Sequence, residues 1–425
     1  MPLLVRSCHP RFALLVFVLA AANLPAWGQA PLTLADALHL AASKAPGWSA
    51  SKAAARGARE RAVAANQLPD PVLRAGVDNL PVNGADAFSL ERDFMTMRRI
   101  GVMQEYVSTA KRGVRQQRGE REARRFEAEA EMSRAEVRTD VAIAWYDRVY
   151  ARRTEQLLQA LADEIAMQQR ATDAQIASGR ATAADALVTR ALLVQARDRV
   201  MTAHRQQESA TARLARWLGE DASRPPMDDA ALPADADAAM LPEHDLHNIP
   251  HLRVLAGQVD VADAEVKVAE QDRSPNWSWE VSYAQRGSSY SNMISVGVSV
   301  PLPIGRSDRQ DREVAARLAQ SDQARELLED ARRRHRSEFS ALRIEWQALR
   351  ERQRQLESAL IPVAKQRVDA LLAAYGSGQQ NLSAVLEARR AEVDARIQIL
   401  ELERDAARLW AQLRYTYLDS AGAKP

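Results

Sequence analysis

The sequence predicts a mainly α-helical protein with a small β part, built from one structural unit that occurs twice along the chain. Three observations support this fold class. Long stretches are rich in Ala, Arg, Gln and Glu, which favour helices. Short segments that alternate apolar and polar residues interrupt them, as in NMISVGVSVPLPIGR at 292–306. The two halves of the chain also resemble each other, segment by segment and in the same order.

Composition limits the kinds of protein that this chain can be. It has 425 residues and a formal net charge of only +2, which excludes a general attraction to nucleic acid. Apolar residues make up 46% of the chain but aromatic residues only 5%, and much of the apolar share is alanine. This balance favours long, closely packed helices over a thick globular core.

The N-terminal residues predict export from the cytoplasm. Basic residues precede an apolar run at 12–22, and a small-residue site follows at 28–30. This layout predicts a signal peptide over residues 1–30, cleaved after Ala30. An uncleaved anchor is the weaker alternative, because the run is short for a bilayer. The only cysteine, Cys8, lies in this segment, so we expect no disulfide, no thiolate metal site and no lipid anchor in the mature chain.

Internal repetition sets the domain organisation. The matching segments are 68–77 with 274–283, 98–112 with 292–306, and 176–190 with 375–389. A Pro- and Asp-rich stretch between the halves predicts a linker. The expected divisions are a signal peptide at 1–30, a first repeat at 31–220, a linker at 221–243, a second repeat at 244–418 and a flexible tail at 419–425.

Each repeat is expected to contain a helix, two strands, a very long helix, a glycine-containing turn and a further helix. The first helices are predicted near 33–66 and 245–272. The strand pairs are predicted near 70–79 and 96–107, and near 276–285 and 292–301.

The second strand pair carries a clear period of two, with small or polar residues between its apolar ones. No segment after the signal peptide is a long enough apolar run for a transmembrane helix, so any entry into a membrane would be by strands. The residues predicted to face lipid are Trp277, Trp279, Val281, Tyr283, Ile294, Val296, Val298 and Val300. The first pair fits less well, because Arg98, Arg99 and Gln104 interrupt its alternation. A small soluble hairpin packed on a helix is the alternative.

The long helices carry an apolar seam in steps of three and four, which is typical of coiled-coil packing. In the second repeat its predicted members are Leu328, Ala331, His335, Phe339, Leu342, Trp346, Leu349, Gln353, Leu356, Leu360, Val363, Arg367, Ala370 and Ala374. Seven-residue spacing also relates Leu386, Val393, Leu400 and Ala407, and in the first repeat Leu187, Val194 and Met201. Arms of ~65 residues would be ~100 Å long and must extend into water. Pro362 predicts a kink.

The number of predicted strands implies that several copies of the chain assemble. Four strands cannot close a barrel, and unpaired strand edges are not tolerated in lipid. Three copies would supply a twelve-stranded outer-membrane β-barrel, whereas two would give eight strands, too narrow for a conduit. We therefore expect a cyclic homotrimer.

These features together resemble the TolC-type outer-membrane efflux channel family, over nearly the whole mature chain. The resemblance rests on the duplication, the strand pairs between long helices and the turns SGRATAADAL and GSGQQNLSAVL. It implies a trimer in the outer membrane of a Gram-negative bacterium, with helices that cross the periplasm and close at their inner tip. It also implies two partners, a periplasmic adaptor (membrane fusion) protein and an inner-membrane RND pump that supplies the energy.

The resemblance assigns roles at the tips. Gly179 and Gly378 match the turn glycines of the family, and Tyr375 matches a tyrosine that helps close the gate. Asp185 and Glu387 match acidic gate positions. At a further position where the family has an acidic residue, this chain has Ala384, and Gln380 stands where the family has a gate arginine. The set of charged residues that closes the gate in the family is therefore reduced here. Around a threefold axis, three copies of Glu387 would attract cations. Alternatively, these acids are ordinary solvated helix residues.

The segments at 68–81 and 95–112 resemble the heavy-metal-export branch of this family. Such a channel would conduct cations such as copper, zinc, cobalt or cadmium; a multidrug or type I secretion channel is the alternative. His244, His247 and His251 share a spacing that suits metal binding. Surface or helix-capping roles are the more ordinary reading of these histidines.

Two other classes of protein fit less well. A periplasmic coiled-coil adaptor or spacer would explain the helices but not the alternating strands. An enzyme would need catalytic motifs, and the sequence contains no phosphate loop, nucleophile elbow or HExxH motif. We therefore expect no catalysis and no cofactor.

Overall fold

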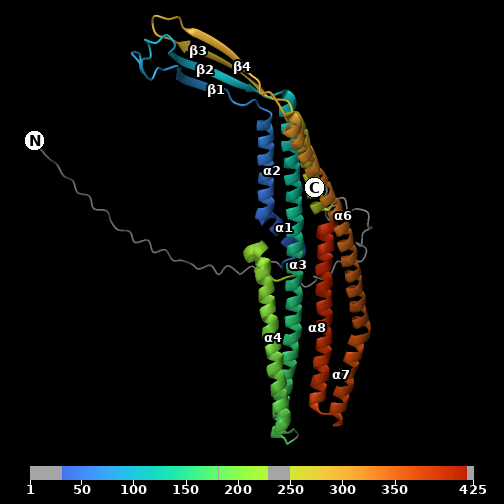
Figure 1. Ribbon diagram of the computed structural model, residues 1–425. Coiled ribbons are helices and arrows are strands. Elements are labelled where there is room, and N and C mark those ends of the chain that lie inside the picture. The colour runs from blue at the N-terminus through green and yellow to red at the C-terminus, as the bar shows by residue number, and fades with distance from the viewer. Residues whose placement is uncertain (1–30, 180, 228–248, 419–425) are drawn as a thin grey trace, which may run out of the picture.

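The computed structural model of the chain describes residues 31–179, 181–227 and 249–418. The predicted signal peptide, the tail at 419–425 and most of the predicted linker lie outside the described residues, as do His244 and His247. The described part is elongated, with a β-sheet at one end and two helical hairpin tips at the other (Figure 1).

The predicted element order is confirmed in both repeats. The first repeat contains α1 (Leu34–Lys44), α2 (Pro46–Ala65), β1 (Val72–Asp78), β2 (Met97–Tyr106), α3 (Thr109–Ala177), α4 (Ala183–Leu218) and the 3-10 turn η1 (Gly219–Ser223). The second contains α5 (Pro250–Asp272), β3 (Trp277–Gln285), β4 (Met293–Ser299), the 3-10 turn η3 (Arg306–Asp308), α6 (Gln310–Gln355), the π turn η4 (Leu356–Leu360), α7 (Ile361–Gly376), α8 (Leu382–Gln412) and the π turn η5 (Leu413–Leu418).

The first predicted helix is in fact two. Helix α1 ends at Lys44, and Ala45 adopts an extended conformation with φ −70° and ψ 111° before Pro46 begins α2. The cause is local, because the ring of a proline disfavours helical geometry in the residue before it. The helix predicted from residue 245 begins, within the described residues, at Pro250.

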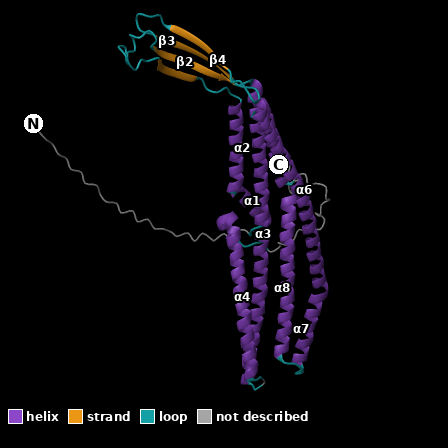
Figure 2. Ribbon diagram, in the orientation of Figure 1, coloured by secondary structure: helices purple, strands orange, loops and turns teal. Residues whose placement is uncertain are grey.

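The four strands form one antiparallel sheet in the order β1-β2-β3-β4. The two repeats meet at its centre, where Ile100 pairs with Tyr283 and Val102 with Val281. Because side chains alternate along each strand, this register places Ile100 and Val102 on the same face as Tyr283 and Val281. The sheet projects from the helices at the end of the molecule (Figure 2).

Helix α3 is the central element of the helical part. It has 69 residues and packs against α2 and α5 near the sheet and against α4 and α8 further down. The main core lies at mid-height, where Val141 and Tyr146 of α3 are 0% and 1% exposed and meet Leu214 of α4 and Trp410 of α8. A smaller apolar cluster near the tips contains Leu161.

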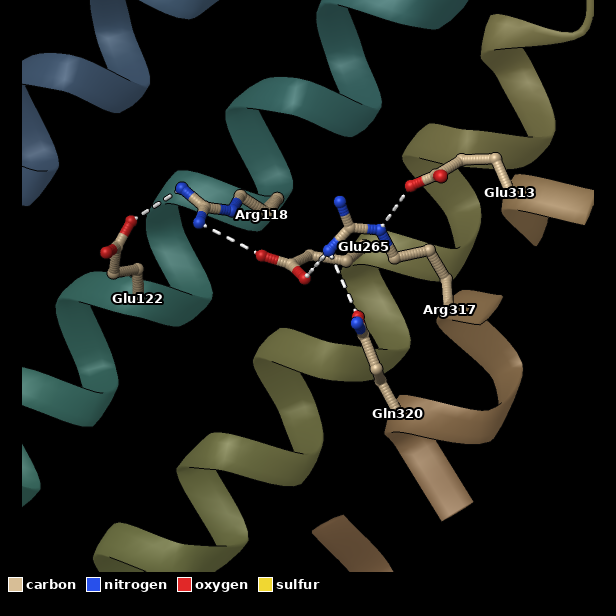
Figure 3. Close-up of polar contacts among 6 residues, drawn as sticks. All are labelled: Arg118, Glu122, Glu265, Glu313, Arg317 and Gln320. Carbon is tan, nitrogen blue, oxygen red and sulfur yellow. Dashed lines mark hydrogen bonds and ion pairs between the residues drawn. The ribbon is translucent and has the colours of Figure 1, made fainter. Parts of the chain in front are cut away.

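Charged groups join the helices below the sheet. The carboxylate of Glu265 in α5 accepts hydrogen bonds from Arg118 of α3 at 3.1 Å and from Arg317 of α6 at 2.9 Å (Figure 3). Each arginine is also held on its own helix, Arg118 by Glu122 at 2.7 Å and Arg317 by Glu313 at 2.8 Å. Glu265 therefore links three helices that belong to both repeats.

The predicted seam holds along α6 and then shifts. Leu328, Phe339 and Trp346 are buried, but Leu360 and Val363 are 38% and 61% exposed. Ile361 donates its N–H to Leu356 five residues back, so the π turn adds one residue to the helical register. Beyond it the buried positions fall one residue later, with Val368 buried and the predicted Arg367 exposed. The seam prediction for Leu360, Val363, Arg367 and Ala370 is therefore wrong. Pro362, where a kink is predicted, lies two residues after the end of the π turn.

The seam predicted for α4 does not pack against the other helices of this chain. Leu187, Val194 and Met201 are 65%, 67% and 64% exposed, while Leu193 and Ala203 are buried. Small residues on the buried face allow α4 to lie close to α3, and the larger apolar residues form a second stripe that faces away. In α8, by contrast, Leu386, Val393 and Ala407 are buried and Leu400 is partly buried, as predicted.

Two glycines of α3 provide a matched test of this packing. A Cβ atom on Gly119 would lie 2.7 Å from the Cβ and 2.9 Å from the Cα of Ala62 in α2, whereas one on Gly113 would meet nothing within 4 Å. We expect Gly119→Ala to destabilise the protein by about 1–3 kcal/mol through overpacking. Gly113→Ala should leave stability unchanged or raise it, because alanine favours helix. Thermal unfolding midpoints would compare the two variants, and an unchanged midpoint for Gly119→Ala would contradict the close approach.

Candidate functional site

The two hairpin tips have nearly identical turns. Gly179 and Gly378 adopt left-handed φ values of +72° and +73°, which glycine accepts without a steric penalty. Each donates its N–H to the carbonyl three residues back, Gly179 to Ile176 and Gly378 to Tyr375, both at 3.0 Å. The preceding serines, Ser178 and Ser377, are also equivalent, because each hydroxyl donates to the third carbonyl before it at 3.0 Å. The sequence repeat is thus a geometric repeat at the tips.

The helices that leave the turns differ in one carboxylate. Thr182 caps α4, and Asp185 completes the cap by accepting from the Thr182 N–H at 2.9 Å and from its hydroxyl at 2.7 Å. Asn381 caps α8 by accepting from the N–H of Ala384 at 3.0 Å, with no acid at the equivalent position. The hydrogen bonds from Thr182 hold the pKa of the exposed Asp185 carboxyl below its usual range. Asp185 is therefore engaged with its own helix start.

Tyr375 connects the two hairpins. Its hydroxyl lies 3.3 Å from the side-chain nitrogen of Gln175 in α3 and 3.4 Å from the side-chain oxygen. Tyr375 stands at the end of α7 and Gln175 near the end of α3, so this contact joins the two tips. Gln175 is absent from the sequence predictions, because nothing in its local pattern distinguishes it from other glutamines of the helix.

Glu387 and Gln380, the other two predicted gate residues, are exposed. Neither side chain has a hydrogen-bond or ion-pair partner among the residues that the structure describes. The carboxylate of Glu387 is therefore not neutralised by the described part of its own chain.

One polar connection between the hairpins involves a buried glutamate that the sequence analysis does not predict. The side chain of Glu392 is 0% exposed and lies between Arg389 at 2.5 Å and Arg396 at 2.6 Å, all on α8. Arg389 also reaches α3, where its Nε lies 2.9 Å from Glu164. A buried carboxylate without a partner is costly, so these arginines are required for its burial. The sequence signal that could have indicated this site is the presence of arginines three residues before and four residues after Glu392, since these positions lie on the same side of a helix.

A second ion pair joins α4 to α8 at a similar level. Arg199 lies 2.6 Å from Asp394. The first hairpin thus contacts the second through both of its helices, above the turns at Gly179 and Gly378.

The other end of the molecule presents the predicted apolar face. Trp277, Trp279, Val281 and Tyr283 are 37% to 43% exposed, and Ile294, Val296, Val298 and Val300 are 50% to 74% exposed. These side chains do not pack on the protein's own helices. The opposite face is polar, with ion pairs at 3.0 Å between Arg74 and Glu280 and between Arg99 and Asp78. Among the described helices, none combines the length and apolar character needed to cross a membrane.

His251 lies in the helical core and not in a histidine cluster. Its Nδ1 is 2.9 Å from Nε2 of His335 in α6, and Nδ1 of His335 is 3.5 Å from the Tyr417 hydroxyl. No group of three or more candidate metal ligands occurs in the described ranges. The predicted partners His244 and His247 lie outside those ranges. The described contacts of His251 are those of a hydrogen-bonded core histidine.

An elongated chain with an apolar-faced sheet at one end and paired hairpin tips at the other has the architecture of an outer-membrane channel subunit. Residues 241–416 match the family of outer membrane efflux proteins. The cobalt-zinc-cadmium resistance protein CzcC of Cupriavidus metallidurans is 24% identical over 376 residues, which cover 87% of this chain and 86% of CzcC.

Solved structures share the fold. The outer membrane channel CmeC of Campylobacter jejuni superposes with a TM-score of 0.76 at 13% identity, covering 91% of this chain and 86% of CmeC. The outer membrane protein VceC of Vibrio cholerae gives a TM-score of 0.72 at 17% identity, covering 90% of this chain and 95% of VceC. The second repeat thus matches the outer membrane efflux protein family, and the similarities together support the function of an outer-membrane efflux channel.

The burial of His335 predicts that the stability of the core depends on pH. Burial lowers the pKa of His335, with His251 and Arg334 acting in the same direction and Glu338 opposing them. Because the folded state prefers neutral His335, its contribution to stability is present above the pKa of the unfolded chain and is lost as the pH falls. We expect the thermal midpoint of the wild type to drop more between pH 8 and pH 5 than that of His335→Leu. Equal drops would contradict this assignment.

Proposed function

We propose that this efflux channel is the outer-membrane component of a tripartite system that exports heavy-metal cations. The cargo is supported by the similarity to CzcC, a cobalt-zinc-cadmium resistance protein, over most of both chains. The conduit role is supported chiefly by one observation, the apolar sheet face at the opposite end of the molecule from the paired tips (Figure 1). Conduction would be passive, with no catalysis by the chain itself.

Assembly as a homotrimer is part of this proposal. The edges of the sheet, β1 and β4, each lack a second neighbour within the described chain. Three copies would pair these edges and close twelve strands, with the face of Trp279 and Val296 toward lipid. The exposed stripe of Leu187, Val194 and Met201 on α4 would pack on the next copy, since apolar heptad stripes favour helix partners.

The hairpin tips would form the periplasmic gate and the docking end for the adaptor and the RND pump. The contacts Tyr375–Gln175 and Arg389–Glu164 would hold the closed arrangement, and opening would require them to separate. Secretion by a signal peptide cleaved after Ala30, without a lipid anchor, and the two-repeat division at 31–220 and 244–418 complete the proposal.

A deletion strain tests the cargo. Loss of the gene should increase sensitivity to cobalt, zinc or cadmium salts, and a plasmid copy should restore resistance. Growth across a series of metal concentrations would measure the effect, with a set of hydrophobic drugs as the comparison. Unchanged metal tolerance together with increased drug sensitivity would favour a multidrug channel instead. A water-soluble monomer without detergent would favour a periplasmic spacer.

The unpaired carboxylate of Glu387 gives a test of the tip. Three copies around the pore should attract cations, so Glu387→Gln should lower the cation preference measured from reversal potentials in planar bilayers. Asp198→Asn is a suitable control, because Asp198 is an exposed acid of α4 that also has no partner among the described residues. Unchanged selectivity in Glu387→Gln, or an equal change in the control, would remove Glu387 from the pore lining.

A further inference from the structure

A groove of about 540 Å³ lies between α3, α4 and α8, well above the hairpin tips. Helix α3 forms its floor, and the facing sides of α4 and α8 form its walls. The walls therefore come from different hairpins. The volume falls within the range of pockets that hold small molecules.

The α4 wall carries two arginines with free guanidinium groups. Arg205 and Arg213 both line the groove and are exposed. Neither forms a hydrogen bond or an ion pair within the described parts of the chain. Other arginines of the long helices, such as Arg118, Arg199 and Arg389, are paired with carboxylates. The two are eight residues apart, or about 12 Å along the helix axis.

The α8 wall adds two more arginines, Arg404 and Arg408, one helical turn apart. Arg404 pairs with the adjacent Asp405 at 2.8 Å. The Nε of Arg408 lies 3.5 Å from the Asp147 carboxylate on the groove floor, which is a long contact. Both side chains retain N–H groups for a ligand, since a guanidinium has five donors.

Negative groups in the groove are too few to neutralise this charge. Asp147 and Glu401 are its acidic lining residues, against four arginines. The side chain of Asp147 is 15% exposed, and Glu401 has no partner among the described residues. Burial raises the pKa of the Asp147 carboxyl, and the nearby Arg408, Arg404 and Arg213 oppose this shift. The groove therefore has a surplus of positive charge.

We propose that this groove binds a small polyanion that carries two or more phosphate or carboxylate groups. The planar guanidinium fork matches the oxygen pairs of these groups, and charge-assisted hydrogen bonds are stronger than neutral ones. One anionic group would bind between the α4 and α8 arginines near Arg205, and a second near Arg213. Hydroxyls of Thr154 and Ser209 line the same space and can complete the hydrogen bonding. Such a ligand would bridge the two hairpins.

Pyrophosphate and citrate are suitable probes, because one carries phosphates and the other carboxylates. Full-length protein purified in detergent should bind at least one of them by isothermal titration calorimetry at constant ionic strength. Arg205→Gln and Arg213→Gln should each weaken binding by about tenfold or more, because each removes charge-assisted hydrogen bonds. Arg205→Lys should weaken it less, since it keeps the charge but loses the fork. Glucose, which is uncharged, should not bind.

Arg197→Gln is the matched control. Arg197 is an exposed arginine of α4 without a partner among the described residues, and it does not line the groove. The Arg197→Gln variant should bind the probe with the affinity of the wild type. The proposal is overturned if neither probe binds the wild type at millimolar concentration, or if Arg197→Gln weakens binding as much as Arg205→Gln. Metal or drug sensitivity of the deletion strain does not enter this test, so its outcome is separate from that of the channel function.

Discussion

The architecture depends on one continuous helix. Helix α3 has 69 residues, about 100 Å, and carries the sheet at one end and a hairpin tip at the other. Most of the stability of a helix in a protein comes from packing of its apolar face and not from propensity. Helices α2 and α5 cover its upper half, and α4 and α8 its lower half. Small residues such as Gly119 and Ala123 allow these partners to approach closely, so the length of the molecule follows from close packing along α3.

Ion pairs between charged side chains also connect the helices, in addition to their apolar packing. A glutamate held by two arginines occurs near the sheet, where Glu265 of α5 joins α3 and α6, and nearer the tips, where Glu392 is held by two arginines of its own helix α8. An exposed ion pair contributes little stability, but burial of one partner makes the other necessary. Glu392 therefore fixes Arg389 in a position from which it reaches Glu164 of the other hairpin.

Most of the fold could be predicted from the sequence because its signals are local. Period-two alternation identified the strands around Trp279 and Val296 to within a few residues, and the repeat identified both turns. The helix-seam predictions fail where the spacing of apolar residues along the sequence does not determine which side of the helix is buried. A π turn has no sequence signature here, so the seam beyond Leu356 was displaced by one residue. Along α4, spacing revealed the stripe of Leu187 but could not say whether it faces its own chain or another.

Less of the candidate site could be predicted, for a physical reason. Backbone turns at Gly179 and Gly378 are local, whereas Glu164 and Arg389 are far apart in sequence and meet only because α3 and α8 pack together. Asp185 was identified by position, yet its carboxylate engages Thr182 within its own helix start. Each tip is thus a self-contained turn and cap, while the contacts between hairpins lie at Tyr375 and above. It follows that the hairpins can separate without unfolding either turn, because no cap hydrogen bond among the described residues crosses between them.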